Sequence, residues 1–100
     1  MRIAFHDDND LDFTLVIKDE SKKDKVIECM EKGIDAWYGA TDPEHYKGDA
    51  FTKEEVEGFY WEGYAEPTEI LLKREGIEFE LVEDEYNEDG ERIADVIVCY

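Results

Sequence analysis

The first residues whose types and spacing could do chemistry are aspartates near the start of the chain. Asp8, Asp10 and Asp12 have the spacing of the first three ligands of an EF-hand calcium loop, and Asp19 falls at its twelfth position. The sixth position, where that loop needs glycine, is Phe13, and the twelfth ligand is normally glutamate. The segment therefore leaves a weak calcium-binding module as an alternative to a solvated acidic turn.

The histidines and cysteines of the chain are not spaced as catalytic or metal-binding residues usually are. His6, His45, Cys29 and Cys99 do not lie at metal-ligand spacing, and both cysteines fall in apolar surroundings, where a reduced, buried thiol is the common outcome. No nucleophile elbow, zinc-protease motif or phosphate-binding glycine loop occurs. We therefore expect a non-enzymatic protein without a catalytic residue, a metal site or a cofactor.

Net charge limits the class of partner. The 100 residues include 29 acids and 11 bases, a formal net charge of −18, and the second half carries 16 acids against 4 bases. Such a field repels nucleic acid and anionic membrane, whereas it attracts a basic protein or a cation. The simpler alternative to partner binding is that the net charge only keeps the protein soluble.

Two groups of carboxylates could form a contact surface. On a helix expected after Thr52, the residues Glu54, Glu57 and Trp61 share a side, because positions three and four apart are neighbours. On a following strand, Glu78 and Glu80 point away from the apolar residues between and beside them. Carboxylates at these spacings can imitate a row of DNA phosphates.

The run "EDEYNEDGE" (83–91) extends this acidic surface. Its Glu83, Asp84 and Glu85 could pair with arginines in a nucleic-acid-binding groove, and Tyr86, like Trp61, offers a ring for guanidinium stacking. The alternatives are that the 40–50 loop covers Trp61, that Tyr86 only closes a hairpin, and that the run is a solvated face.

The segment "GYAEPTEILLKREGIEFELVEDEYNEDG" (63–90), a short helix leading into an acidic hairpin, resembles the small acidic proteins of bacteriophages and other mobile elements, a group that includes anti-CRISPR inhibitors. The resemblance spans roughly residues 50–90 and is one of size, charge and general pattern. It implies a protein that occludes the basic groove of a host nucleic-acid-binding protein, such as a CRISPR effector. It transfers no residue roles.

The elements that would position these residues follow from periodicity. Segments 2–6 and 12–18 alternate apolar and polar residues and predict a hairpin around "DDND". Segment 20–39 changes to helical spacing, with a Ser21/Asp24 capping pair at its start and Gly39 at its end. A T-x-x-E capping box at Thr52 predicts a helix over about 53–65, with Phe59, Tyr60 and Gly63 facing inward.

The last third of the chain predicts a short helix and two strands. Pro67 near a first helical position and Gly76 as a stop indicate a helix over about 68–76. Segments 77–83 and 92–100 read as strands that the Asp89-Gly90 turn pairs as a hairpin, the apolar last strand lying inside the sheet.

The order β-β-α-α-β-β predicts a single α+β domain over residues 1–100, with an antiparallel sheet of about four strands and helices packed on one face. No long apolar run or signal peptide occurs, so we expect a soluble, cytoplasmic protein. Our functional hypothesis is a DNA-mimic type inhibitor or modulator of a basic nucleic-acid-binding protein. The alternative is an acidic structural or oligomer-forming domain without mimicry.

Overall fold

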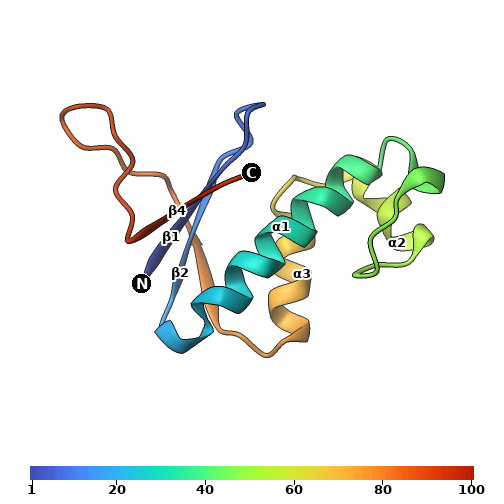
Figure 1. Cartoon of the computed structure of the whole chain (residues 1–100), viewed down its shortest axis with the longest axis horizontal. Helices are drawn as coiled ribbons and strands as arrows, with labels where there is room; N and C mark the ends of the chain where they lie inside the picture. The colour runs from blue at the N-terminus through green and yellow to red at the C-terminus, as the bar shows by residue number, and fades with distance from the viewer. The chain divides into compact units, whose positions relative to one another are not determined.

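The computed structural model describes all 100 residues, which divide into two compact units (Figure 1). The sheet unit comprises residues 1–23 and 77–100, and the helical unit comprises residues 24–76. The predicted α+β class is confirmed, as is the number of strands. The strands are β1 (Arg2–His6), β2 (Phe13–Ile17), β3 (Phe79–Val82) and β4 (Val96–Cys99).

The predicted N-terminal hairpin is confirmed. β1 and β2 pair antiparallel, and the aromatic rings of the opposed residues Phe5 and Phe13 stack with centroids 5.0 Å apart. In the connecting turn, the Asp10 backbone N–H donates to the Asp7 carbonyl over 2.9 Å. Asp10 adopts a φ of 61°, a left-handed conformation that Asp and Asn tolerate better than most residues.

The predicted pairing of the last two strands is wrong. The sheet order is β3-β2-β1-β4, so β3 and β4 lie at opposite edges, and β4 is not an interior strand. β4 runs parallel to β1, beside which it lies in Figure 1, so the sheet is mixed rather than purely antiparallel. Local turn chemistry indicated the hairpin, but β4 pairs with the free edge of β1, far away in the sequence.

Residues 83–95 connect β3 to β4, and we call them the crossover. β2 is antiparallel to both β1 and β3, so β1 and β3 run in the same direction, and β4 runs parallel to β1. The strands β3 and β4 are therefore parallel, and a connection between parallel strands needs about a dozen residues or more. The predicted Asp89-Gly90 turn does form, with Gly90 at a φ of 80°, but it closes only a small loop within the crossover. That loop is closed by a β-bridge between Tyr86 and Arg92 and by hydrogen bonds at Asn87, whose side chain accepts the backbone N–H groups of Asp89 and Glu91.

The two faces of the sheet differ in polarity. Strand register places Arg2, Ala4 and His6 of β1 on the same face as Thr14 and Val16 of β2, and the crossover hydrogen bonds to this face. The opposite face carries the apolar core of the sheet unit, all of it buried: Ile3, Phe5, Phe13, Leu15, Ile17 and Val98. Alternation along β1 and β2 therefore separates a core face from a face covered by the crossover.

The helical unit contains three α-helices and two 3₁₀ turns. They are α1 (Lys23–Gly39), η2 (Pro43–His45), α2 (Lys53–Gly58), η3 (Phe59–Trp61) and α3 (Glu66–Arg74). A further 3₁₀ turn, η1 (Glu20–Lys22), precedes α1. No helix of the structure combines the length and the apolarity needed to cross a membrane.

The long predicted helix is confirmed as η1 followed by α1, and it ends at Gly39 as expected. Its start differs from the predicted Ser21/Asp24 capping pair, because the Asp19 side chain accepts the Ser21 backbone N–H instead. Within α1, Gly33 lies against Thr68 of α3 so closely that an added Cβ would stand 2.3 Å from the threonine Oγ1. A glycine is therefore what allows these two helices to approach.

The predicted helix over 53–65 is too long. The capping box of Thr52 and Glu55 is present, but α2 ends at Gly58 and the chain continues as the 3₁₀ turn η3. Gly58 and Gly63 both favour non-helical backbone, which weakens the helix at these points. α3 extends over Glu66–Arg74 rather than the predicted 68–76, and Pro67 lies in its first turn as predicted.

Candidate functional site

The 3₁₀ turn η3 decides which aromatic side chains of the helical unit reach the surface. A 3₁₀ turn has three residues per turn, so its three side chains point in three different directions. Phe59 is buried against Phe51, with ring centroids 4.8 Å apart, whereas Tyr60 is 59% exposed and Trp61 is 85% exposed. The prediction that Trp61 faces outward is confirmed, and the prediction that Tyr60 faces the core is wrong.

Tyr60 and Trp61 form one wall of a surface hollow of about 430 Å³. Their rings meet nearly at right angles, with centroids 4.8 Å apart and an interplanar angle of 79°. The remaining lining comes from α2 and from the segment around η2, and consists of Ala40, Pro43, Glu44 and Glu57. The loop after α1 thus borders the hollow and leaves Trp61 uncovered. We call these six lining residues the aromatic hollow.

The carboxylates at the hollow lack cationic partners within the chain. Glu44 and Glu57 are exposed, as is the neighbouring Glu54, and none of the three takes part in an ion pair. Two ring faces beside two unpaired carboxylates attract a cation, by the ring quadrupole and by charge. The predicted group Glu54, Glu57 and Trp61 therefore lies together on an open surface.

The same unit contains an arginine site that is already occupied. The Arg74 guanidinium lies 5.1 Å from the centroid of the Phe51 ring, and it pairs with the Glu55 carboxylate and donates to the Ala50 carbonyl. Hydrogen bonds from the Thr52 backbone, followed by the pairing with Arg74, lower the pKa of Glu55. In this site, an aromatic ring and a carboxylate of the helical unit together bind a guanidinium of the same unit.

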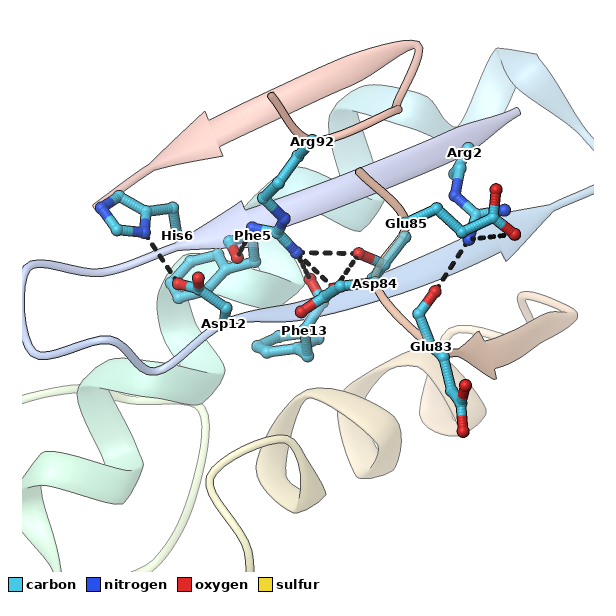
Figure 2. Close-up of polar contacts among 10 residues, drawn as sticks. Arg2, Phe5, His6, Asp12, Phe13, Glu83, Asp84, Glu85 and Arg92 are labelled. Carbon is cyan, nitrogen blue, oxygen red and sulfur yellow. Dashed lines mark hydrogen bonds and ion pairs between the residues drawn. The ribbon is translucent and has the colours of Figure 1, made fainter. Parts of the chain in front are cut away.

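In the sheet unit, most of the predicted acidic contact residues reach the surface. Glu78, Glu80, Glu83 and Glu85 are exposed, and Tyr86 is 54% exposed. Of these carboxylates, only that of Glu85 has a cationic partner, Arg2 at 3.6 Å. Figure 2 shows that the crossover also accepts a hydrogen bond from Arg2 at the Glu83 carbonyl, which leaves the Glu83 carboxylate outside the contact.

Asp84 differs from its neighbours in the run, because its carboxylate is used inside the protein. It pairs with Arg92 at 2.6 Å and accepts the Thr14 hydroxyl. The Arg92 guanidinium also donates to the carbonyls of Phe5 and Phe13 (Figure 2). Asp84 is thus engaged in fastening the crossover to β1 and β2, and its geometry favours a structural role over the predicted contact with a partner.

Sequence reasoning missed the Arg92 network. The available signal was a single arginine at the start of the apolar segment 92–100, where a charged side chain needs a partner if it is buried. The Arg92 side chain is only 10% exposed and that of Asp84 is 23% exposed. The pair therefore explains why an otherwise polar segment lies against the sheet.

Two of the four aspartates that resemble a calcium loop, Asp12 and Asp19, use their side chains in other contacts. Asp12 lies 2.7 Å from Nδ1 of His6 (Figure 2), and Asp19 caps the turn η1. No group of three or more histidine, cysteine or acidic side chains in the chain has the geometry to hold a metal ion. The arrangement does not favour the calcium-binding alternative.

The two cysteines differ in their surroundings. Cys29 in α1 is buried, as expected, and burial raises the pKa of its thiol. Cys99 is exposed, so the expectation that it is buried is wrong. Strand register explains the difference: Val98 points to the core face of β4, and its neighbour Cys99 points to the opposite face.

The chain was also compared with protein-family models, with curated proteins and with solved structures, and none of the three comparisons found a match.

Proposed function

We propose that the protein is a non-catalytic acidic binding protein that occupies the nucleic-acid-binding surface of a basic protein, as a DNA-mimic type inhibitor or modulator. The observation that carries this proposal is the aromatic hollow, where two exposed rings adjoin carboxylates that have no cationic partner in the chain. An isolated exposed apolar side chain needs no explanation, but a paired tyrosine and tryptophan at an acidic hollow suits a contact surface.

The acids of the sheet unit support the same proposal independently. Glu78 immediately precedes β3, which is an edge strand, and Glu80 lies within it. Glu83, at the start of the crossover, is also exposed. Like-charged side chains that are left unpaired raise the energy of the free protein. A basic surface that neutralises them lowers this energy on binding, so the partner is expected to be a protein rich in arginine and lysine. A CRISPR effector would belong to this class.

The test combines capture with displacement. The tagged protein is used to capture basic proteins from a host lysate, and each captured protein is then mixed with labelled DNA or RNA and increasing amounts of the acidic protein. We expect loss of nucleic-acid binding, and an affinity for the captured protein that falls steeply between about 50 mM and about 200 mM salt.

A variant with Glu54, Glu57, Glu78 and Glu80 all changed to Gln should lose most of this affinity while its circular dichroism spectrum stays unchanged. The control changes four exposed acids that belong to neither predicted group, Asp8, Glu20, Asp24 and Glu31, to the corresponding amides. Captured proteins that keep their nucleic acid, or an affinity that salt and the four substitutions leave unchanged, would contradict the proposal.

One observation favours the alternative of an oligomer-forming domain. β4 is an edge strand with an apolar sequence, "VIVC", and its Ile97 is 50% exposed. An unprotected edge strand can pair with a strand of another chain. Sedimentation of the protein at low and high salt separates the two functions, since an apolar strand interface gives a dimer that persists in high salt.

A further inference from the structure

We propose that the aromatic hollow binds an arginine side chain of the basic partner, with the guanidinium against the rings of Tyr60 and Trp61 and its N–H groups directed at the carboxylates of Glu44 and Glu57. This inference rests on the proposed function. It specifies which chemical group of the basic partner the aromatic hollow recognises. It concerns residues 40–61 alone.

The shape of the hollow suits a flat cation. The rings of Tyr60 and Trp61 meet at 79°, so together they form a corner with two aromatic surfaces. A guanidinium is planar and can stack on one ring while its edge remains free to donate hydrogen bonds. Glu57 from α2 and Glu44 from η2 line the same hollow and supply the acceptors.

The Arg74 site supports the choice of arginine. There, the Arg74 guanidinium lies 5.1 Å from the centroid of the Phe51 ring and pairs with Glu55. Glu55 belongs to α2, the helix that also supplies Glu57 to the aromatic hollow. The aromatic hollow repeats the combination of ring and carboxylate without an arginine from its own chain. This combination is complementary in charge and in shape to an arginine side chain of another protein.

Lysine fits this arrangement less well. Its ammonium group is a compact and strongly hydrated charge that cannot stack, and it gives up more hydration on entering a site walled by aromatic rings. Attraction to the net charge of −18 acts on both residues equally. The part of the arginine preference that is lost when Trp61 is replaced therefore measures the contribution of the rings, separately from charge and from pairing with carboxylates.

The experiment compares two peptides of equal length and charge, nine arginines and nine lysines, by titration calorimetry with the full chain at low salt. We expect the arginine peptide to bind roughly three- to tenfold more tightly, from a cation–π contribution of about 1 kcal/mol. In Trp61→Ala and in the double variant Tyr60→Ala/Trp61→Ala, the ratio should fall toward one, while the affinity for the lysine peptide stays the same.

Tyr100→Ala is the matched control, since Tyr100 is also an exposed aromatic residue but belongs to the sheet unit and to none of the predicted contact groups. This variant should keep the preference for arginine. The indole N–H of Trp61, identified in NMR spectra by its loss in Trp61→Ala, should shift on addition of the arginine peptide.

The outcomes separate this inference from the proposed function. If both peptides bind with equal, salt-sensitive affinity, or if the arginine preference survives Trp61→Ala, the arginine site is refuted and the acidic binding function stands. If neither peptide binds, the proposed function itself fails. A preference for arginine that disappears with Trp61 and persists in Tyr100→Ala supports both.

Discussion

At the scale of single residues, Arg92 shows how one charged side chain can organise a segment that has no regular structure. Its guanidinium donates to the Phe5 carbonyl at 2.6 Å and to the Thr14 hydroxyl at 2.8 Å, and it pairs with Asp84. These groups come from β1, β2 and the crossover. The N–H donors of a guanidinium are spread over three nitrogens in a planar fork, whereas the donors of a lysine ammonium all share one nitrogen.

Replacing Arg92 by Met should lower the free energy of unfolding by about 3 kcal/mol, because the Asp84 carboxylate is left largely buried without its partner. Arg92→Lys should recover only part of this loss. The measurement is urea-induced unfolding followed by circular dichroism. Arg2→Met serves as the control, since Arg2 pairs with the more exposed Glu85 at 3.6 Å, and should cost about 1 kcal/mol or less. A cost of about 1 kcal/mol or less for Arg92→Met would show that the Arg92 network does not fasten the crossover.

At the scale of elements, the helical unit depends on the close approach of α1 and α3. The backbone nitrogen of Thr68 would lie 2.7 Å from a Cβ placed on Gly33, and the hydroxyl would lie nearer still. Thr68 is fully buried, so the contact cannot open without disturbing the surrounding residues. Helix crossings of this kind admit only a small residue at the point of contact.

Gly33→Ala should therefore destabilise the protein by about 1–3 kcal/mol, the usual cost of overpacking, even though alanine is the better helix former. Gly58→Ala is the control, because Gly58 lies in α2 and nothing stands within 4 Å of an added Cβ. This second variant should be stabilised by about 0.5–1 kcal/mol. Thermal unfolding of the two variants beside the parent protein gives the comparison, and a stabilised Gly33→Ala would contradict the close helix contact.

At the scale of the whole molecule, the dominant property is the excess of 29 acids over 11 bases. Repulsion among these charges opposes the folded state, and a counter-charged partner relieves it. Salt should consequently act in opposite directions on folding and on binding. It screens the repulsion within the chain, and it also screens the attraction to a basic partner.

We expect the melting temperature to rise when sodium chloride is increased from about 10 mM to about 200 mM, because the Debye length then falls from about 30 Å to below 10 Å. Over the same range the affinity for the arginine peptide should fall. Sodium chloride is used for both measurements, and sucrose serves as an uncharged control for binding, which it should leave unchanged. A melting temperature that fell with salt would show that the attractive ion pairs outweigh the repulsion.

Several features of this protein follow from the sequence by itself. Alternation in 2–6 and 12–18 determines the first hairpin, helical spacing and Gly39 determine α1, and the Thr52/Glu55 capping box determines where α2 begins. These features depend on residues near one another in the chain. The outward position of Trp61 is also predicted correctly, although from a continuous helix over 53–65 that the structure replaces with the turn η3.

Only the tertiary structure decided the rest, because those features depend on residues far apart in the sequence. The Asp89-Gly90 turn predicted a local hairpin, whereas the partner of β4 is β1, more than 90 residues earlier. In the sequence, Asp84 cannot be distinguished from its exposed neighbours. Only the folded chain brings Arg92 and Thr14 within hydrogen-bonding distance of its carboxylate. α2 ends at Gly58, and the following 3₁₀ turn directs its side chains differently from a continued α-helix. Tyr60 therefore lines the aromatic hollow instead of packing in the core. Charge and periodicity are thus local properties of the chain, while strand order and the pairing of a buried arginine are determined only when distant segments meet.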